Sequence, residues 1–307
     1  MVAAAASVFR IAFDAMASRC EVRLAAADEG AAAEVAKAAI GEVKRIEAKY
    51  SRYRPYSIVS RINAAAGSEW IECDEETAAL LGYADSIYAA SGGLFDITSG
   101  VLRRAWDFRN AVCPTPEQLR LLTALIGWDK VQREPRHVRL PKAGMELDFG
   151  GFGKEYAADR AVAVLMEQGV QSGYINLGGD IRVIGPQPDG RPWAIGIQDP
   201  RRVDGIVATI PISHGALATS GDYERYFELD GKRYCHILDP RSGMPVRYWR
   251  SVSVLAPLAI AAGSCSTIAM LKQEEGLAFL EASGMRYLAM DGEGNLLHKN
   301  ALQSDAA

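Results

Sequence analysis

The sequence predicts an α+β protein with mixed or antiparallel sheets and flanking helices. Short alternating runs bounded by turn residues indicate hairpins, and longer stretches with apolar residues at helical spacing indicate separate helices. These two kinds of segment do not alternate regularly, which argues against a doubly wound parallel sheet. The chain of 307 residues can bury a full core. We expect one domain over 1–307, with two closely packed subdomains as the alternative.

The first half of the chain is predicted to hold an opening strand pair and several helices. Two alternating runs within residues 7–24 indicate the strands. Helical patterns cover three later stretches: 31–50, 77–90 and 114–126. Gly92 and Gly93 are typical of a helix C-terminus. Asp96 and Thr98 come just before an apolar helical pattern, so we favour a capping role for both.

The middle of the chain is predicted to change from strand to helix through glycines. The stretch MELDF over 145–149 indicates a strand, and Lys154 follows three glycines at the start of the next helix. Backbone N–H groups at such a helix start can approach a phosphate. The spacing matches neither the dinucleotide fingerprint nor the P-loop. Residues 174–185 indicate two strands joined by a glycine turn that carries Asp180. The alternative to a functional role for this turn is a simple hairpin turn.

The last third of the chain is predicted to contain hairpins around one long helix. Residues 216–229 indicate a turn and a strand, with a return strand after Asp230-Gly231. A further strand at 252–257 leads into a helix that runs through Leu280, and 285–297 indicates a closing hairpin.

The return strand ends in HILDPRSG, which places three chemically useful side chains near one strand end. His236 supplies a base near neutral pH, Asp239 an anion, and Arg241 a planar cation, a combination that suits phosphate chemistry. A hairpin with a buried histidine and a surface ion pair fits the residues equally well.

Composition excludes several classes of protein. A net charge of −4 and a pI near 5.7 argue against nucleic acid or an anionic membrane as the main partner. Five cysteines without a CxxC pair and four scattered histidines argue against a disulfide framework or a histidine metal cage. The N-terminus lacks the features of a signal peptide, and no apolar run has the roughly 20 residues of a membrane span. We expect a cytoplasmic protein, although a trimmed periplasmic one would look the same.

Six stretches, in this order, resemble the ApbE family of FAD:protein FMN transferases. They are SRYRPYSIVSRIN, GGLFDITSG, LDFGGFGKEYAADRA, YINLGGDIRVIG, ATSGDYERYF and HILDPRSGMPV. The resemblance extends from Met16 to the GSCSTIAML helix, nearly the whole chain. It implies a T-fold-related α+β fold that binds FAD in a cleft. With magnesium, such a protein transfers the FMN half of FAD to a Ser or Thr hydroxyl of an acceptor flavoprotein and releases AMP.

The resemblance also implies roles for individual residues. His236 is the best candidate for the base that accepts the hydroxyl proton, and Lys154 and Arg241 are candidates for neutralising phosphate charge. A larger set is expected to line or shape the flavin cleft: Met16, Tyr53, Asp96, Lys154, Asp159, Gly178, Gly179, Asp180, Ser220, Gly221, Asp222, His236 and Asp239. For Asp159 and Asp180, a role as a cap or turn residue is the alternative.

The expected magnesium site departs from the family pattern. The family usually reads A-D-A-L-S-T, in which the Asp and Thr hold the metal, whereas this chain reads AGSCST, with Gly263 at the Asp position and Thr267 kept. Gly153 replaces an Ala whose backbone carbonyl helps to hold the metal, and Glu155 replaces a Gly. Magnesium is usually bound through one or two carboxylates. Either a nearby acid, Asp180 or Glu155, or water takes over, or metal binding is weak.

Three functions therefore remain open. The first is the FMN transferase, the second a flavin-binding protein that has lost transfer, and the third an FAD-hydrolysing relative. If the missing carboxylate limits metal binding, we expect Gly263→Asp to raise magnesium-dependent turnover.

Overall fold

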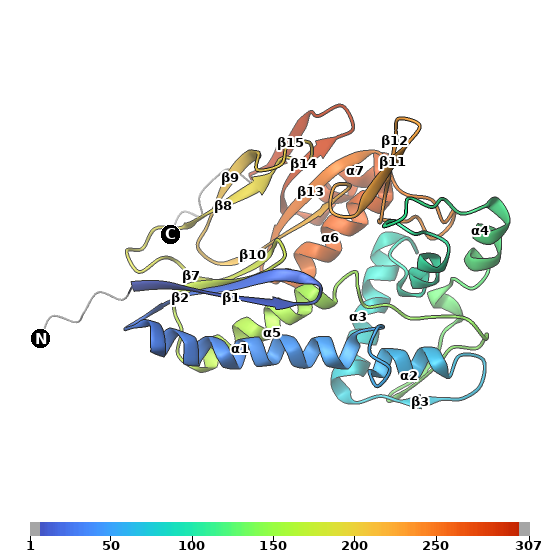
Figure 1. The fold of residues 1–307 in the computed structure, drawn as a ribbon, viewed down its shortest axis with the longest axis horizontal. Helices are drawn as coiled ribbons and strands as arrows, with labels where there is room; N and C mark the ends of the chain where they lie inside the picture. The colour runs from blue at the N-terminus through green and yellow to red at the C-terminus, as the bar shows by residue number, and fades with distance from the viewer. Residues whose placement is uncertain (1–6, 301–307) are drawn as a thin grey trace, which may run out of the picture.

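An eight-stranded sheet forms the centre of the computed structural model, which describes residues 7–300 (Figure 1). Neighbouring strands of this sheet pair antiparallel, as the sequence predicts. In sheet order the strands are β1 (Ser7–Ala15), β2 (Ser18–Ala26), β6 (Gly173–Leu177), β7 (Asp180–Gly185), β10 (Gly215–Gly221), β13 (Trp249–Ala256), β14 (Arg286–Asp291) and β15 (Leu296–Lys299).

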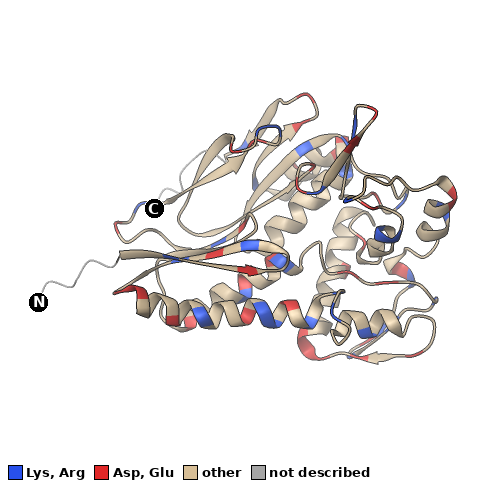
Figure 2. Ribbon diagram, in the orientation of Figure 1, with Lys and Arg blue, Asp and Glu red and all other residues tan. Residues whose placement is uncertain are grey.

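The helices are α1 (Glu29–Tyr50), α2 (Ile58–Ala64), α3 (Glu75–Ser91), α4 (Pro116–Thr123), α5 (Gly153–Glu167), α6 (Ala259–Lys272) and α7 (Gly276–Ser283), with short 3₁₀ helices η1 (Ile97–Arg104), η2 (Trp128–Lys130) and η3 (Gln273–Glu275). Of these, α1, α5 and α6 cover one face of the central sheet (Figure 1). Acidic and basic side chains are interspersed along α1 (Figure 2). Arg45 and Lys49 of α1 both pair with Glu76 of α3, which ties the two helices together.

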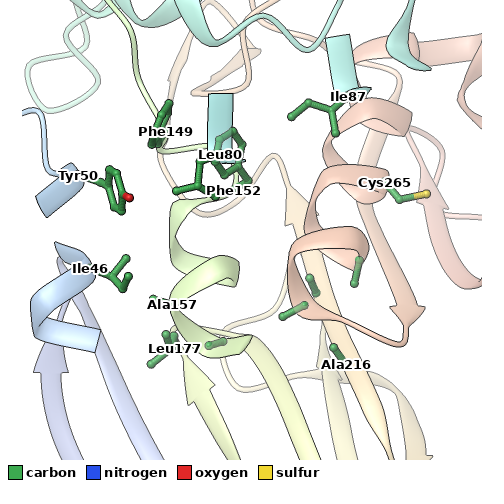
Figure 3. Packing of buried hydrophobic residues seen from close by; sticks show 14 of the residues in the cluster. Ile46, Tyr50, Leu80, Ile87, Phe149, Phe152, Ala157, Leu177, Ala216 and Cys265 are labelled. Carbon is green, nitrogen blue, oxygen red and sulfur yellow. The ribbon is translucent and has the colours of Figure 1, made fainter. Parts of the chain in front are cut away.

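The main core lies between the sheet and helices α1, α5 and α6. Figure 3 shows Ile46 of α1, Ala157 of α5 and Leu177 of β6 meeting there, and all three are buried. Small residues on α5 and on the adjoining strands let the helices approach the sheet closely. This packing fixes the N-terminus of α5 and the middle of α6, where the candidate site lies.

A hairpin covers the opposite face of the sheet. Strands β8 (Trp193–Gln198) and β9 (Ile206–Ile212) pair antiparallel and pack Ile195 and Ile210 against Leu217 of β10. Ala216 and Ala218 join the helical core instead, because successive strand residues point to opposite faces. The sequence analysis assigned neither strand of this hairpin.

Smaller sheets lie away from this centre. One combines β3 (Ile71–Glu72), β5 (His137–Arg139) and β4 (Gln132–Glu134), and another pairs β11 (Tyr226–Leu229) with β12 (Lys232–Cys235). The predicted hairpin around Asp230-Gly231 is therefore confirmed. Residues 216–221, which the sequence analysis placed in the turn and strand before Asp230, instead belong to β10 of the central sheet.

The strand predicted over 145–149 is wrong. The Asn63 side chain accepts a hydrogen bond from the Leu147 N–H at 2.6 Å and donates to the Leu147 carbonyl at 2.9 Å. The Asp148 N–H donates to the carbonyl of Ile97. Because a side chain and the η1 turn take up these backbone groups, no neighbouring strand is needed to pair them.

The single helix predicted through Leu280 is divided into two. Gln273 adopts a left-handed φ of 50° directly after α6, and its carbonyl accepts a hydrogen bond from the Trp249 indole at 2.7 Å. A Cβ at Gly276 would lie 2.7 Å from the same indole nitrogen, so the chain can turn here only with glycine. Helix α7 then starts in a new direction.

The predicted helix end at Gly92 is confirmed, because Gly92 is left-handed and caps the C-terminus of α3. The structure adds an N-cap at Asp74 of α3 and a capping box at Thr115 of α4. The five cysteines are free in the described structure. Among the described helices, none is long and apolar enough to cross a membrane. The predicted absence of a signal peptide partly concerns residues 1–6, which lie outside the described range.

Candidate active site

Lys154 and Asp180 form a buried ion pair between α5 and the β6–β7 turn. Lys154 lies in the first turn of α5, and its Nζ is 2.8 Å from Asp180 Oδ2. The same ammonium group donates to the Gly178 carbonyl at 3.4 Å. Burial raises the pKa of Asp180, and the charge of Lys154 opposes that rise. The Lys154 side chain as a whole is 30% exposed, so it can contact a bound anion as well as Asp180.

The glycine turn before Asp180 brings a second hairpin into the site. Gly178 and Gly179 have positive φ values of 59° and 101°, which glycine adopts readily. A Cβ at Gly178 would lie 2.7 Å from Ser18, so only glycine allows the β1–β2 turn to approach this closely. Met16 lies in that turn, and its N–H donates to Glu47 at 2.9 Å. The structure thus places the β1–β2 turn that carries Met16 beside Gly178.

Hydroxyl groups connect the end of β10 to α6. Ser220 Oγ lies 2.8 Å from Ser266 Oγ and 2.9 Å from Thr267 Oγ1. The Ser266 hydroxyl also donates to the carbonyl of Gly263 at 2.9 Å. Ser266 was not singled out in the sequence analysis, although it lies within the AGSCST stretch. Ser220 and Thr267 are both partly exposed, so their hydroxyls can be reached from solvent.

Glu155 fills the space beside Gly263. A Cβ added at Gly263 would lie 2.6 Å from Cγ and 2.8 Å from Cδ of Glu155. Glu155 is only 8% exposed, and its buried Oε2 has no hydrogen-bond partner in the described structure. Burial, and then the negative charge of Asp180, raises the pKa of Glu155 to about 8. A single Gly263→Asp substitution would therefore require Glu155 to move, because Glu155 already occupies that volume.

His236 follows β12 directly and faces a basic residue. The backbone N–H of His236 donates to the carbonyl of Arg225 at 3.0 Å, while the buried Nδ1 atom of its ring has no hydrogen-bond partner in the described structure. Burial, and then the charge of Arg225, lowers the pKa of His236 to about 4. The imidazole is therefore neutral at pH 7 and free to accept a proton or hydrogen bond at Nδ1.

Two of the predicted cleft residues have their carboxylates occupied within the fold. Asp96 accepts from the Thr98 N–H at 2.7 Å, the Thr98 hydroxyl at 2.6 Å and the Trp128 N–H at 2.9 Å. Asp159 of α5 accepts from the first two N–H groups of α6, each at 2.9 Å, and pairs with Arg182. Capping thus describes both residues, and they can shape the site only by holding its walls.

Other predicted site residues are held by arginines or lie at the surface. Asp222 accepts two hydrogen bonds of 2.7 Å from Arg201. Asp239 binds the backbone N–H and guanidinium of Arg241, whose side chain is 68% exposed. Tyr53 is 74% exposed and lies under the guanidinium of Arg52. Gly221, another predicted cleft residue, lies against an aromatic ring: a Cβ there would be 2.7 Å from Cδ1 of Tyr223.

The sequence analysis also missed Arg225, which lies close to two of the predicted residues. The charge of Arg225 lowers the pKa values of both His236 and Tyr53, so it lies within electrostatic reach of both. A basic residue two positions after the TSGDY stretch was the available signal. A positive charge within electrostatic reach of His236 favours an anionic ligand near that ring.

Comparison with known proteins identifies the family. The ApbE family model matches residues 16–289. The chain belongs to the ApbE family. The FAD:protein FMN transferase of Haemophilus influenzae is 30% identical over 273 residues, which cover 84% of this chain and 79% of the relative. The protein of the same name from Vibrio cholerae is 32% identical over 249 residues, covering 78% and 74% respectively.

Solved structures of ApbE proteins share this fold. The crystal structure of the ApbE protein from Thermotoga maritima superposes with a TM-score of 0.87 at 31% identity, covering 95% of this chain and 97% of that one. The flavin transferase ApbE from Vibrio cholerae gives a TM-score of 0.86 at 26% identity, with 97% and 99% covered. The α+β fold expected from the resemblance is therefore confirmed.

The described part of this ApbE protein contains no group of three or more His, Cys, Asp or Glu side chains placed to bind a metal. A cation here would need hydroxyl, carbonyl and substrate oxygens besides carboxylates. Magnesium binds in that way, through one or two carboxylates and phosphate oxygens. The unpartnered Oε2 of Glu155 is an available oxygen of this kind, so the residues present fit magnesium.

Proposed function

We propose that this chain is an FAD:protein FMN transferase. It would move the FMN half of FAD to a Ser or Thr hydroxyl of an acceptor flavoprotein and release AMP. The observation that carries the proposal is the set of polar contacts between α5, the β6–β7 turn, β10 and α6, which gathers Lys154, Asp180, Ser220 and Thr267. The names of its ApbE relatives support the same activity.

The chemistry requires charge neutralisation and a proton acceptor. The acceptor hydroxyl attacks the phosphorus on the FMN side of the pyrophosphate, a P–O bond forms, and the bond to AMP breaks. Lys154 would stabilise the negative charge on the phosphate oxygens. The neutral His236 would take the hydroxyl proton at Nδ1. A pKa of about 4 is low for a base, but a bound pyrophosphate would raise it because the negative charge favours the imidazolium.

Magnesium would bind near the start of α5. The residues that could hold it are the Glu155 carboxylate, the Thr267 hydroxyl and the Gly153 carbonyl, with Asp180 close by. Bound there, magnesium would supply positive charge to the pyrophosphate oxygens.

Mass spectrometry of an acceptor domain tests this proposal. The purified protein is incubated with FAD and a flavinylatable acceptor domain, with and without magnesium, beside a working ApbE relative as positive control. We expect the acceptor to gain the mass of FMN only with magnesium. His236→Gln should lower the rate by about 10²-fold or more, the typical contribution of a general base. An unchanged acceptor mass would contradict the proposal, and free FMN and AMP without modified acceptor would indicate hydrolysis.

A further inference from the structure

The contact between Glu155 and Gly263 explains why each residue stands where it does. Gly263 lies inside α6 with ordinary helical geometry, so its backbone does not require glycine. The packing against Glu155 requires glycine at position 263, because a Cβ there would collide with Cγ and Cδ of Glu155. The carboxylate from α5 therefore occupies the volume that an acidic side chain at position 263 would fill.

The surroundings of Glu155 lack the partners that buried carboxylates normally have. Among the buried acidic side chains of the described structure, only Glu155 has a carboxylate oxygen that is buried and unpartnered. Asp96, Asp159 and Asp180 each accept hydrogen bonds or pair with a cation. Buried polar groups without partners are rare in proteins and frequently mark a missing ion or ligand. An oxygen in this position points to a cation that completes the site.

The neighbouring groups select the kind of cation. Thr267 lies one turn after Gly263 on α6, and therefore on the same helix face, with its hydroxyl tied to Ser220. Carboxylate and hydroxyl oxygens are hard ligands, which favour magnesium or manganese over zinc. Asp180 is the other acid nearby, but its carboxylate is already paired with Lys154 at 2.8 Å.

We propose that Glu155 supplies the carboxylate ligand of the divalent cation in this protein, in place of an acidic side chain at position 263. The ligand has thus moved from α6 to α5 while its carboxylate stays in the same volume. The inference rests on the proposed function for its biological role, but the metal site can be tested without FAD or acceptor.

Direct binding of Mn²⁺ tests the site. Mn²⁺ is a hard cation with the same ligand preference as magnesium, and its unbound fraction can be measured by electron paramagnetic resonance. We expect Glu155→Gln to weaken Mn²⁺ binding about tenfold or more, as loss of a metal-site group does. Glu167→Gln, the same change at the far end of α5, should leave binding unchanged. Equal affinity of wild type and Glu155→Gln, or no binding to wild type at millimolar Mn²⁺, would overturn the proposal.

A reciprocal exchange provides a stronger test. Glu155→Gly should bind Mn²⁺ as weakly as Glu155→Gln, and adding Gly263→Asp to it should restore affinity to within about threefold of wild type, since the carboxylate returns to the same volume. A folded double variant that binds no better than Glu155→Gly would contradict the exchange. Melting curves check folding, and Mn²⁺ should raise the Tm of wild type but not of Glu155→Gln. If the double variant fails to fold, the Mn²⁺ affinities of wild type and Glu155→Gln still decide whether Glu155 is a metal ligand.

The two proposals fail in different ways. Mn²⁺ binding that depends on Glu155, without any FMN transfer by wild type, would contradict the proposed function and leave the metal site standing. FMN transfer by wild type, with Mn²⁺ binding unaffected in Glu155→Gln, would support the proposed function and contradict the metal site.

Discussion

His236 illustrates how one buried ring atom can couple the site to the stability of the fold. Its pKa is lowered to about 4 by burial and by Arg225, whereas an unfolded histidine titrates near 6.5. Between about pH 4 and 6.5, His236 binds a proton in the unfolded chain but not in the folded chain. The stabilising effect of neutral His236 is therefore fully present above pH 6.5 and is lost as the pH falls through this window.

Replacing His236 should weaken this dependence on pH. We expect the free energy of unfolding to fall by about 1–2 kcal/mol more in wild type than in His236→Gln when the pH is lowered from 7 to 5. Urea unfolding at both pH values measures the difference. His137→Gln, which removes an exposed histidine, is the matched control and should follow wild type. Parallel curves for wild type and His236→Gln would show that His236 titrates normally in the folded protein.

At the scale of secondary structure, α5 and α6 are joined by a cap that one helix provides for the other. Leu258, the N-cap residue of α6, offers no side-chain hydrogen bond. Asp159 of α5 instead accepts from the N–H groups of Ala259 and Ile260. This cap fixes the start of α6, and with it the helix face that carries Gly263 and Thr267.

Removing this shared cap should cost more than removing a local one. We expect Asp159→Ala to lower the free energy of unfolding by about 2–3 kcal/mol, because two N–H groups lose their acceptor and the partly buried Arg182 loses its carboxylate. Asp28→Ala removes the exposed cap of α1 and should cost about 1 kcal/mol. Urea unfolding of both variants makes the comparison. If Asp159→Ala were no more destabilising than Asp28→Ala, the coupling of the two helices would be unimportant.

Elements that carry their own end signals were the ones that could be predicted from sequence. The sequence analysis used Gly92 to end α3, and it located both α3 and α4 to within a few residues. The caps at Asp74 and Thr115 likewise lie within these helices' own local sequence. The errors arose where a distant residue decides the local structure. Asn63 takes up the backbone groups of the predicted strand at 145–149, and Trp249 helps to end α6. Neither interaction can be read from a local pattern.

At the scale of the whole molecule, the candidate site collects residues from distant parts of the chain. The sequence supplied the residue types, and it left Asp180, Glu155, water or weak metal binding as the alternatives for the missing carboxylate. Only the fold shows that Glu155 is the one lying against Gly263, because that contact depends on how α5 packs beside α6. The assignment of the whole chain to one domain stays a prediction.

The two faces of the central sheet should contribute separately to stability and activity. The β8–β9 hairpin packs on the face opposite the helices, and Ile210 is fully buried there. We expect Ile210→Ala to lower the free energy of unfolding by about 2–4 kcal/mol, as large-to-small core substitutions do. Well below its Tm, this variant should keep the wild-type rate of FMN transfer, because Lys154, Glu155 and Thr267 lie on elements of the helical side.

Comparison with a site variant completes this test. Lys154→Ala should reduce transfer even well below its own Tm, and it should also lose stability because the buried Asp180 carboxylate loses its cation. Initial rates of transfer and melting temperatures are measured for both variants in parallel. A fully folded Ile210→Ala protein with impaired transfer would mean that the hairpin face takes part in the reaction, and the site would then have to extend through the sheet.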